Sequence, residues 1–348
     1  MKRAAIIGAT GFGGLGLIDL LSRHPWIRAA SLYALDHGSA ISAMFPHLKG
    51  ICDLEVMPPE RINHADTDIV FLSTPDQTGM KMARQFYENG IPVIDFSGDF
   101  RFHSMEDYRV YAENRGMSAS HDSPDLLASS VYGLPEKYNE QIAGAAIIGN
   151  PGCFAMSMIL GLLPAVEKGA LKPGVIICDG KTGVSGAGIN PGKANSYPLR
   201  YDNSNTYKEG KHQHLVEVEN VLNGVSVSGG IKIMFVPQIV PMNRGIITTI
   251  YAEPSEKCST DTLVEMYKDY YEGSPFIHVT AGSPSTNDVR GTNRCVIAPK
   301  YDSRTGRVLV ISAIDNLMKG QSGNAVQNAN IRLGFDQAEG LKLSPFYP

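Results

Sequence analysis

Short apolar runs alternate with helix-like segments along the first third of the chain. The run at 68–73 lacks the period-two alternation of a half-exposed strand, as is typical of strands covered on both faces. This alternation predicts a parallel sheet with crossover helices, the doubly wound α/β arrangement of a Rossmann dinucleotide-binding domain. Strands are expected at Arg3–Gly8, Ala29–Leu35, Asp68–Ser73 and Ile91–Phe96, and helices at Gly14–Ser22 and Met80–Asn89.

The pattern changes beyond about residue 150. An apolar helix is expected at Phe154–Leu163, and a segment rich in glycine, asparagine, serine and tyrosine covers 183–211. These features predict an α+β catalytic and oligomerisation domain with a mixed sheet over residues 153–315. Small and apolar residues at helical spacing then predict a C-terminal helix, about 316–348, that completes the dinucleotide-binding domain of residues 1–152. Further strands are expected at Gly174–Cys178, Ile231–Val236, Gly245–Ala252 and Arg307–Ile314.

Composition excludes several classes of protein. The 348 residues carry a net charge of −4, so there is no basic excess for a nucleic-acid partner. The most apolar stretch, Phe154–Val166, has 13 residues and is shorter than the ~20 residues of a membrane span. The N-terminus lacks the apolar region of a signal peptide, so we expect a cytoplasmic protein without a membrane partner.

A glycine-rich loop follows the first expected strand and opens the first expected helix. Glycines here allow a tight turn and a close approach of the backbone to a pyrophosphate, whose charge is met by the helix N-terminus. Asp36 follows the second strand, where an acid would bind the ribose 2′-hydroxyl of NAD; alternatively, Asp36 is a solvated turn residue. The loop residues expected to bind a cofactor are Gly8, Thr10, Gly11, Phe12, Gly13 and Gly14.

Cys153 lies at the expected start of the apolar helix, in the run Asn150-Pro-Gly-Cys153. The dipole and the N–H groups of a helix N-terminus favour a thiolate and stabilise an adjacent oxyanion. The position therefore suits a nucleophile, although buried structural cysteines are common. The five cysteines include no CxxC pair that would indicate zinc or a dithiol.

Two histidines and a carboxylate lie together at His212, His214 and Glu217. An imidazole oriented by a carboxylate is the usual acid–base partner of a thiol nucleophile. An HxH pair also binds metals, but no third ligand lies nearby in the sequence, and a merely structural loop is the other alternative. A dinucleotide loop and an activated cysteine in one chain together indicate aldehyde or acyl-phosphate oxidoreduction.

Motifs in the order of a known family extend from residue 8 to about residue 330. The chain resembles the N-acetyl-γ-glutamyl-phosphate reductases of arginine biosynthesis, in the semialdehyde dehydrogenase superfamily. The matching segments are Gly8-Ala-Thr-Gly-Phe12, Phe45-Pro-His-Leu-Lys-Gly50, Ile94-Asp-Phe-Ser-Gly-Asp-Phe-Arg101, Val131-Tyr-Gly-Leu-Pro-Glu136, Asn150-Pro-Gly-Cys153, Asp179-Gly-Lys-Thr-Gly-Val-Ser-Gly-Ala-Gly188, His212-Gln-His214, Val289-Arg-Gly-Thr-Asn-Arg-Cys295 and Ala313-Ile-Asp-Asn-Leu-Met-Lys-Gly320.

The resemblance implies NADPH-dependent reduction of N-acetylglutamyl 5-phosphate to N-acetylglutamate 5-semialdehyde and phosphate. It implies that Cys153 is the nucleophile that forms a thioacyl enzyme and that His212 or His214 is the acid–base, tuned by Glu217. It also implies a homodimer or homotetramer and no bound metal. By the same resemblance, Ser185, Gly186 and Asn316 lie near the nicotinamide, and Arg101 binds the substrate phosphate.

Several positions depart from the family pattern. Ala34-Leu35 and Asp36 replace the Ser-Arg that holds a 2′-phosphate, so the sequence allows NAD as well as NADP. Phe154-Ala-Met156 replaces Tyr-Pro-Thr, and Ile189 replaces an arginine. These changes keep open an aminoadipyl-phosphate reductase of lysine biosynthesis. A dinucleotide-sensing regulator without turnover is the alternative from another class.

Overall fold

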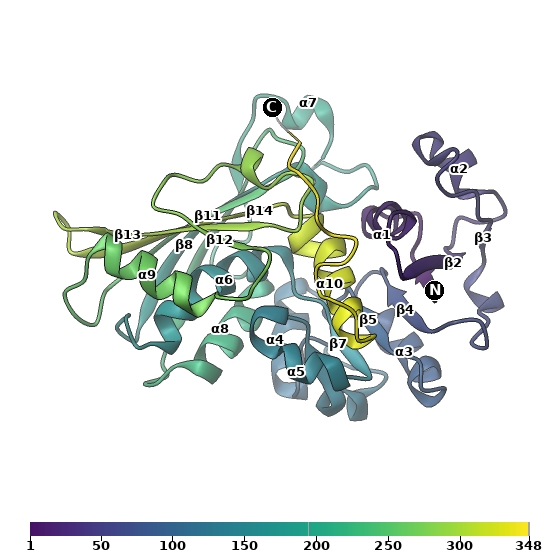
Figure 1. Cartoon of the computed structure of the whole chain (residues 1–348), viewed down its shortest axis with the longest axis horizontal. Coiled ribbons are helices and arrows are strands. Elements are labelled where there is room, and N and C mark those ends of the chain that lie inside the picture. The colour runs from purple at the N-terminus through teal and green to yellow at the C-terminus, as the bar shows by residue number, and fades with distance from the viewer. Residues whose placement is uncertain (194, 347–348) are drawn as a thin grey trace. The chain divides into compact units, whose positions relative to one another are not determined.

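The computed structural model describes residues 1–193 and 195–346, which form two compact units (Figure 1). Unit 1 comprises Met1–Glu113, Ser118–Pro151 and Gln321–Lys342. Unit 2 comprises Asn114–Met117, Gly152–Gly320 and the described residues from Leu343 on. In the part of the chain that is described, no helix is long and apolar enough to cross a membrane.

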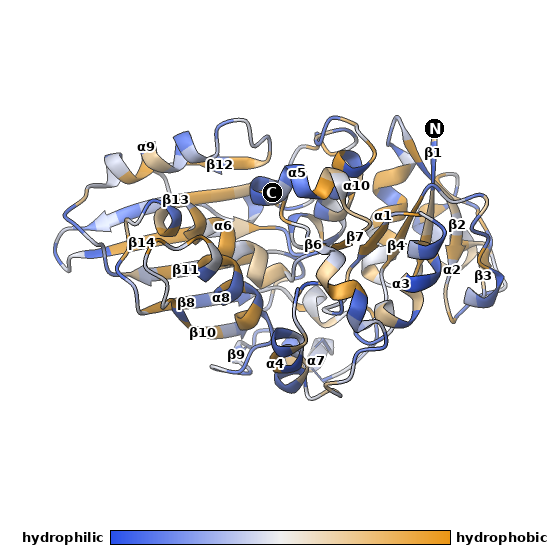
Figure 2. Ribbon diagram, turned by 90° about the horizontal axis from the view of Figure 1, so that it is seen from below, coloured by the Kyte–Doolittle hydropathy of each residue, from blue (hydrophilic) through white to orange (hydrophobic). Residues whose placement is uncertain are grey.

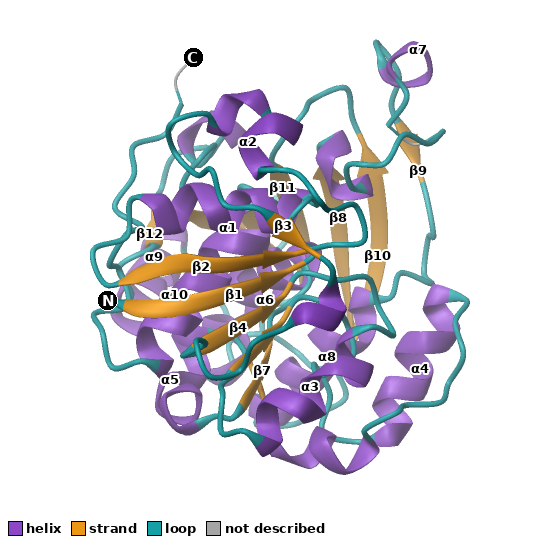
Figure 3. Ribbon diagram, turned by 90° about the vertical axis from the view of Figure 1, so that its right-hand side faces the viewer, coloured by secondary structure: helices purple, strands orange, loops and turns teal. Residues whose placement is uncertain are grey.

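Unit 1 is built on a parallel sheet, as the sequence predicts. The seven strands described there follow the order β3-β2-β1-β4-β5-β7-β6, and part of this fan is seen in Figure 3. The chain proceeds in opposite directions from β1 and β4, so the topological switch point lies between them. The strands are β1 (Lys2–Ile7), β2 (Ile27–Tyr33), β3 (Val56–Met57), β4 (Ile69–Leu72), β5 (Val93–Asp95), β6 (Ser130–Tyr132) and β7 (Ile147–Gly149).

Burial explains why the strands of this sheet lack alternation. All four residues of β4 are buried, and the strands are coloured as hydrophobic in Figure 2. Helix α10 contacts α1, α5 and β5 within unit 1. The helices are α1 (Phe12–Ser22), α2 (Ile41–Met44), α3 (Gly79–Glu88), α4 (Met105–Arg115, in unit 1 as far as Glu113), α5 (Pro135–Gly144) and α10 (Gly323–Arg332).

Unit 2 contains the expected mixed sheet, in the order β12-β13-β14-β11-β8-β10-β9. Pairing is parallel between β8 and β10 and antiparallel between β8 and β11. Among its described elements are strands β8 (Val175–Thr182), β9 (Asn205–Thr206), β10 (Lys232–Ile239), β11 (Ile246–Ala252), β12 (Ile277–Val279), β13 (Cys295–Asp302) and β14 (Arg307–Ile314), and helices α6 (Cys153–Glu167), α7 (Tyr197–Arg200), α8 (His214–Val225) and α9 (Thr260–Tyr270).

One face of this sheet is covered by helices. Helix α6 lies on β11 and β14, α8 lies on β10, and α9 lies on β13, all on the same side in Figure 1. Residues of β8 and β10 therefore alternate between buried and exposed along each strand. The apolar side chains Val175, Ile177 and Met234 are exposed on the face opposite α6, α8 and α9.

Some sequence-based bounds were wrong. Strand β8 was expected to end at Cys178 but continues to Thr182. The polar side chains of Asp179 and Lys181 are accommodated in the strand because they lie on the less buried face of the sheet and form an ion pair. The C-terminal helix was expected from residue 316 but begins at Gly323, after a π-helical turn at Met318–Ser322. Helix α9 and strands β12 and β13 were not anticipated, since their apolar patterns are short or interrupted.

Two tyrosines fix α9 to a weak point of α6. Pro164 lies inside α6 and has no N–H, so the Leu160 carbonyl lacks its usual helical donor. The Tyr271 hydroxyl donates to this oxygen at 2.6 Å, and the Tyr267 hydroxyl donates to the Gly161 oxygen at 2.7 Å. The first of these bonds replaces the one that proline removes.

We expect Tyr271→Phe to lower the free energy of unfolding by roughly 1–3 kcal/mol, because it leaves the Leu160 carbonyl buried without that donor. Tyr267→Phe is the matched control and should cost about 1 kcal/mol or less, since the Gly161 carbonyl keeps its helical N–H donor. Urea unfolding of both variants under one set of conditions gives the comparison. Equal losses would contradict the role assigned to Tyr271.

Candidate active site

The glycine-rich loop lies at the carboxyl end of β1, beside the switch point of unit 1. Gly8 has a φ of +86°, and a Cβ there would lie 2.2 Å from the Ser73 carbonyl oxygen. A Cβ on Gly14 would lie 2.4 Å from the Gly8 oxygen, so only glycine fits at either position. Gly11 is the N-cap of α1, and no side chain caps the helix there. The first N–H groups of α1 are therefore suited to bind a pyrophosphate and to stabilise its negative charge.

Asp36 lies on an exposed turn after β2, at the same end of the sheet as the glycine loop. Its neighbour Leu35 is 91% exposed, which is unusual for leucine. The backbone passes directly back toward β3, because the Gly38 N–H donates to the Val56 carbonyl at 2.9 Å. Both the ribose-binding role and the solvated-turn alternative for Asp36 are compatible with this position.

Cys153 is the first residue of α6 in unit 2 and is partly exposed. Gly152 is the N-cap and has an extended backbone, with no side-chain cap of its own. Gly320 lies on another side of the cysteine: a Cβ there would be 2.8 Å from the Cys153 Cβ. The thiol therefore lies at a helix N-terminus that no N-cap side chain covers, and its surroundings include two glycines.

Glu217 connects the start of α8 to the start of α6. Its buried Oε2 accepts a hydrogen bond from the Gly152 N–H at 2.9 Å. His214, one helical turn earlier on the same face, has Nε2 at 4.0 Å from Glu217 Oε1. The imidazole also packs on Gly152, where a Cβ would lie 2.3 Å from His214 Nε2. Any side chain at position 152 would displace this histidine.

His212 occupies an aromatic enclosure behind His214. Its ring centroid lies 4.6 to 5.8 Å from those of His214, Phe235, Tyr207 and Phe154. The His212 Nδ1 accepts the His214 backbone N–H at 3.2 Å, so the neutral ring carries its proton on Nε2. Burial, followed by the nearby His214, lowers the pKa of His212 to about 2. The two histidines that the sequence could not tell apart thus have different environments.

Three residues predicted to lie near the nicotinamide are brought together in unit 2. Asn316 Nδ2 donates to Ser185 Oγ at 3.0 Å, and Asn316 Oδ1 accepts the Gly245 N–H at 2.7 Å. A Cβ on Gly186 would lie 4.0 Å from Asn316 Nδ2. The turn that begins at Gly183 is therefore fastened to the end of β14. Contact with a nicotinamide stays a prediction.

Arg101 belongs to unit 1, where its guanidinium joins two backbone segments. Nε donates to the Asn150 carbonyl at 2.8 Å, and one terminal nitrogen donates to the Phe96 carbonyl at 2.7 Å. These bonds brace the strand that leads to the nucleophile. The phosphate-binding role predicted for Arg101 remains a prediction.

Sequence reasoning missed several neighbours of the thiol. Tyr207 contacts His212 through its ring, and burial, followed by the charge of Cys153, raises the pKa of its phenol. Asp315 and Arg244 form an ion pair next to the turn that carries Gly320. Asp315 lies in the motif that ends in Gly320, which was a signal for it, but no spacing rule connects that motif to Cys153.

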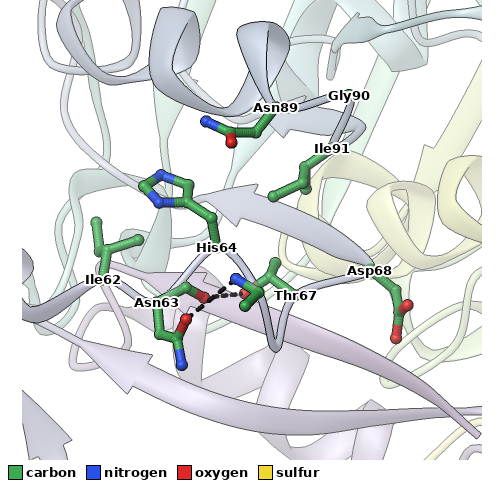
Figure 4. Close-up of a pocket in the computed structure, with 9 residues that line it drawn as sticks. Ile62, Asn63, His64, Thr67, Asp68, Asn89, Gly90 and Ile91 are labelled. Atoms are coloured by element: carbon green, nitrogen blue, oxygen red, sulfur yellow. Dashed lines mark hydrogen bonds between the residues drawn. The ribbon is translucent and has the colours of Figure 1, made fainter.

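A cavity of about 670 Å³ lies elsewhere in unit 1, around segments that precede β4 and β5 (Figure 4). These are amino ends of strands, opposite the glycine loop. Its polar groups bond locally: Thr67 Oγ1 donates to the Asn63 carbonyl at 2.9 Å, and His64 Nε2 lies 3.2 Å from Gln85 Oε1. Among residues 1–193 and 195–346, no three His, Cys, Asp or Glu side chains are grouped to hold a metal ion.

The low pKa of His212 predicts a pH dependence of stability. Unfolded His212 binds a proton below pH 6.5, whereas the folded protein excludes that proton down to about pH 2. Protonation of this group therefore does not affect stability at neutral pH, but below pH 6.5 it stabilises the unfolded state and lowers the free energy of unfolding by about 1.4 kcal/mol per pH unit. In His212→Asn, the Asn oxygen replaces Nδ1 as acceptor, and this part of the acid sensitivity should disappear.

Urea unfolding at about pH 7 and about pH 5 measures the difference. His37→Asn is the control, because His37 is exposed and should leave the acid sensitivity of the wild type unchanged. An identical loss of stability in the wild type and in His212→Asn would show that His212 takes up its proton normally in the folded protein.

Comparisons with known proteins identify both units. Residues 3–145 match the NAD-binding domain of the semialdehyde dehydrogenases, and residues 153–316 match their dimerisation domain. The chain is 38% identical over 356 residues to an N-acetyl-gamma-glutamyl-phosphate reductase of Oceanobacillus iheyensis and 41% identical over 352 residues to one of Geobacillus stearothermophilus. Each alignment covers 100% of both chains.

Solved structures show the same fold at lower identity. Aspartate semialdehyde dehydrogenase II of Vibrio cholerae, complexed with ASA, has a TM-score of 0.71 at 18% identity and covers 96% of this chain and 98% of its own. The Candida albicans aspartate semialdehyde dehydrogenase with NADP has a TM-score of 0.68 at 19% identity, with 95% and 98% covered. The chain belongs to the N-acetyl-gamma-glutamyl-phosphate reductase family, with a nicotinamide dinucleotide-binding domain and a dimerisation domain of the semialdehyde dehydrogenase type.

Proposed function

We propose that this chain reduces N-acetyl-L-glutamyl 5-phosphate to N-acetyl-L-glutamate 5-semialdehyde and phosphate, through a thioester on Cys153. The full-length identity of 38–41% to reductases named for this substrate supports the reaction. The observation that carries the mechanism is the position of Cys153 at an uncapped helix start, with His214 and Glu217 beside it. The reaction belongs to arginine biosynthesis.

The thiolate of Cys153 attacks the acyl carbon, and the phosphate leaves with the electron pair of the carbon–oxygen bond. The N–H groups at the start of α6 stabilise the oxyanion that forms during this attack. His214 Nε2, close to the Glu217 carboxylate, donates a proton to the departing phosphate oxygen and regains one from solvent. His212 remains neutral and orients His214 through the backbone N–H that it accepts.

A reduced nicotinamide dinucleotide held by the glycine loop would supply the hydride that reduces the thioester carbon, which would leave a tetrahedral oxyanion bonded to Cys153 Sγ. That oxyanion collapses, the carbon–sulfur bond breaks, and the semialdehyde and the Cys153 thiolate are released. We propose NADPH as the reductant, bound by the glycine loop of unit 1. NADH is the alternative reductant if Asp36 binds the ribose, because a carboxylate accepts a hydrogen bond from a ribose 2′-hydroxyl and repels a 2′-phosphate.

The reverse assay tests this function with N-acetylglutamate 5-semialdehyde, phosphate and either NADP or NAD. We expect phosphate-dependent reduction of the dinucleotide that falls by at least about a thousandfold in Cys153→Ser. Cys258→Ser is the control, since Cys258 is also partly exposed but lies far along the chain.

Asp36→Ser should shift the ratio of kcat/KM values toward NADP. Dinucleotide binding without any turnover would instead favour a sensing regulator, and turnover only of an aminoadipate analogue would change the substrate.

We further propose that two copies of the chain associate through the face of the unit 2 sheet opposite α6, α8 and α9. Met234, Ile177 and Tyr251 are directly paired neighbours across β10, β8 and β11. With Val175 they form an apolar patch whose members are 43–67% exposed. The match of this unit to a dimerisation domain supports a second copy as the occupant. A two-fold axis through the patch would pair it with itself.

Light scattering coupled to size-exclusion chromatography tests the interface. Ile177→Asp should reduce the mass of the assembly by half, because the charge would be buried against the partner's apolar side chains. Val227→Asp is the control: Val227 is 79% exposed but lies outside the sheet. An unchanged mass for Ile177→Asp would place the interface elsewhere.

A further inference from the structure

A carboxylate buried at the end of β14 organises the loop beside the thiol. Asp315 is 0% exposed, and its two oxygens face three groups. Oδ1 accepts the Leu317 N–H at 2.8 Å, Oδ2 accepts the Gly291 N–H at 2.7 Å, and the Arg244 guanidinium lies 3.0 Å from Oδ2. A buried charge satisfied by this many donors fixes the relative positions of the segments that supply them.

The backbone of Asp315 continues this arrangement to the nucleophile. Its carbonyl oxygen accepts the Met318 N–H at 3.2 Å and the Gly320 N–H at 3.0 Å, which closes a compact turn. Gly320, at the end of that turn, lies so close to Cys153 that a Cβ on it would meet the Cys153 Cβ at 2.8 Å and its Cα at 3.3 Å. The position of Gly320 therefore determines the space available around the thiol.

The next residue extends the same support. Asn316 accepts the Gly245 N–H, and the preceding Arg244 is the residue paired with Asp315. Two consecutive side chains at the end of β14 thus hold two consecutive residues before β11. These two contacts fix the start of the turn of residues 315–320, and Gly320 is the last residue of that turn.

We infer that Asp315 is a positioning residue for Cys153, acting through the turn that places Gly320 against the thiol. The inference rests on the proposed role of Cys153 as nucleophile. Asparagine cannot replace Asp315, because its amide NH₂ would face either the Leu317 or the Gly291 N–H donor. The turn of residues 315–320 would then shift, so Gly320 would no longer be held against Cys153. The thiol would still lie at the start of α6.

Kinetics and thiol alkylation of Asp315→Asn test the role. We expect kcat to fall by about 10- to 100-fold with KM changed less than about twofold, because attack by sulfur is sensitive to misplacement. Iodoacetamide should alkylate Cys153 faster in this variant, with the Cys153→Ser protein as the blank for the other thiols. Glu253→Gln is the matched control: it removes an exposed carboxylate paired with Arg307 in the same unit, and should change neither value.

A double-mutant cycle shows whether Asp315 acts through Gly320. Gly320→Ala alone should slow alkylation by about tenfold, since its methyl group crowds the Cys153 Cβ. With the turn displaced by Asp315→Asn, the same substitution should slow alkylation by less than about threefold. Equal effects of Gly320→Ala in both backgrounds, or wild-type kcat and alkylation in folded Asp315→Asn, would overturn the inference.

If Asp315→Asn does not fold, Arg244→Lys takes its place in the same cycle. Lysine keeps the charge but loses the two-nitrogen contact with the carboxylate, so a smaller shift in the same direction is expected, and its absence overturns the inference. Alkylation needs neither substrate nor cofactor. A wild-type protein without reductase activity would thus count against the proposed function, whereas the alkylation cycle judges Asp315 independently.

Discussion

The hydrogen bond from the Gly152 N–H to the Glu217 carboxylate is the contact on which the thiol site depends. It joins two residues that are 65 positions apart in the chain, at the starts of α6 and α8. A buried carboxylate requires such donors, because its transfer out of water is otherwise costly. The same bond places His214 against the Gly152 backbone, so the imidazole, the carboxylate and the thiol are held by one geometric constraint.

Glycine provides the room that this arrangement needs. Gly152 leaves space for the His214 ring, and Gly320 leaves space for the Cys153 side chain. In the sheet below, a Cβ on Gly180 would lie 2.5 Å from the Phe154 ring, which in turn packs on His212. The aromatic enclosure that keeps His212 neutral thus continues from the packing of α6 on β8. The low pKa of His212 and the packing of the core are consequences of the same close contacts.

The sheet of unit 2 serves two purposes because its faces differ. One face carries α6 and α8, whose N-termini supply the thiol and the imidazole, and the strands there present buried residues. The other face presents alternate residues of the same strands, including Ile177 and Met234. Period-two alternation therefore allows one set of strands to support the proposed reaction site and the proposed association surface on opposite faces.

The sequence by itself determined the class of fold and the local position of the main chemical groups. Apolar runs without alternation predicted the buried parallel strands, and the glycine loop and Cys153 lie where strand and helix boundaries placed them. The sequence also placed His212, His214 and Glu217 close to one another along the chain. These features depend on residues that are close together in the sequence. Hydrophobic periodicity and the residue preferences of helix ends therefore suffice to predict them.

Only the tertiary structure decided which histidine is enclosed, which glycines surround the thiol and what holds Gly320. His212 and His214 are two residues apart, yet it is His212 whose pKa is lowered by burial among rings from distant segments. Asp315 joins residues 244, 291, 317 and 320 through groups of which several are backbone atoms. Every non-proline residue has the same backbone N–H donor, so the pattern of side chains does not predict which N–H groups will bind Asp315. These partners are fixed only when the chain has folded.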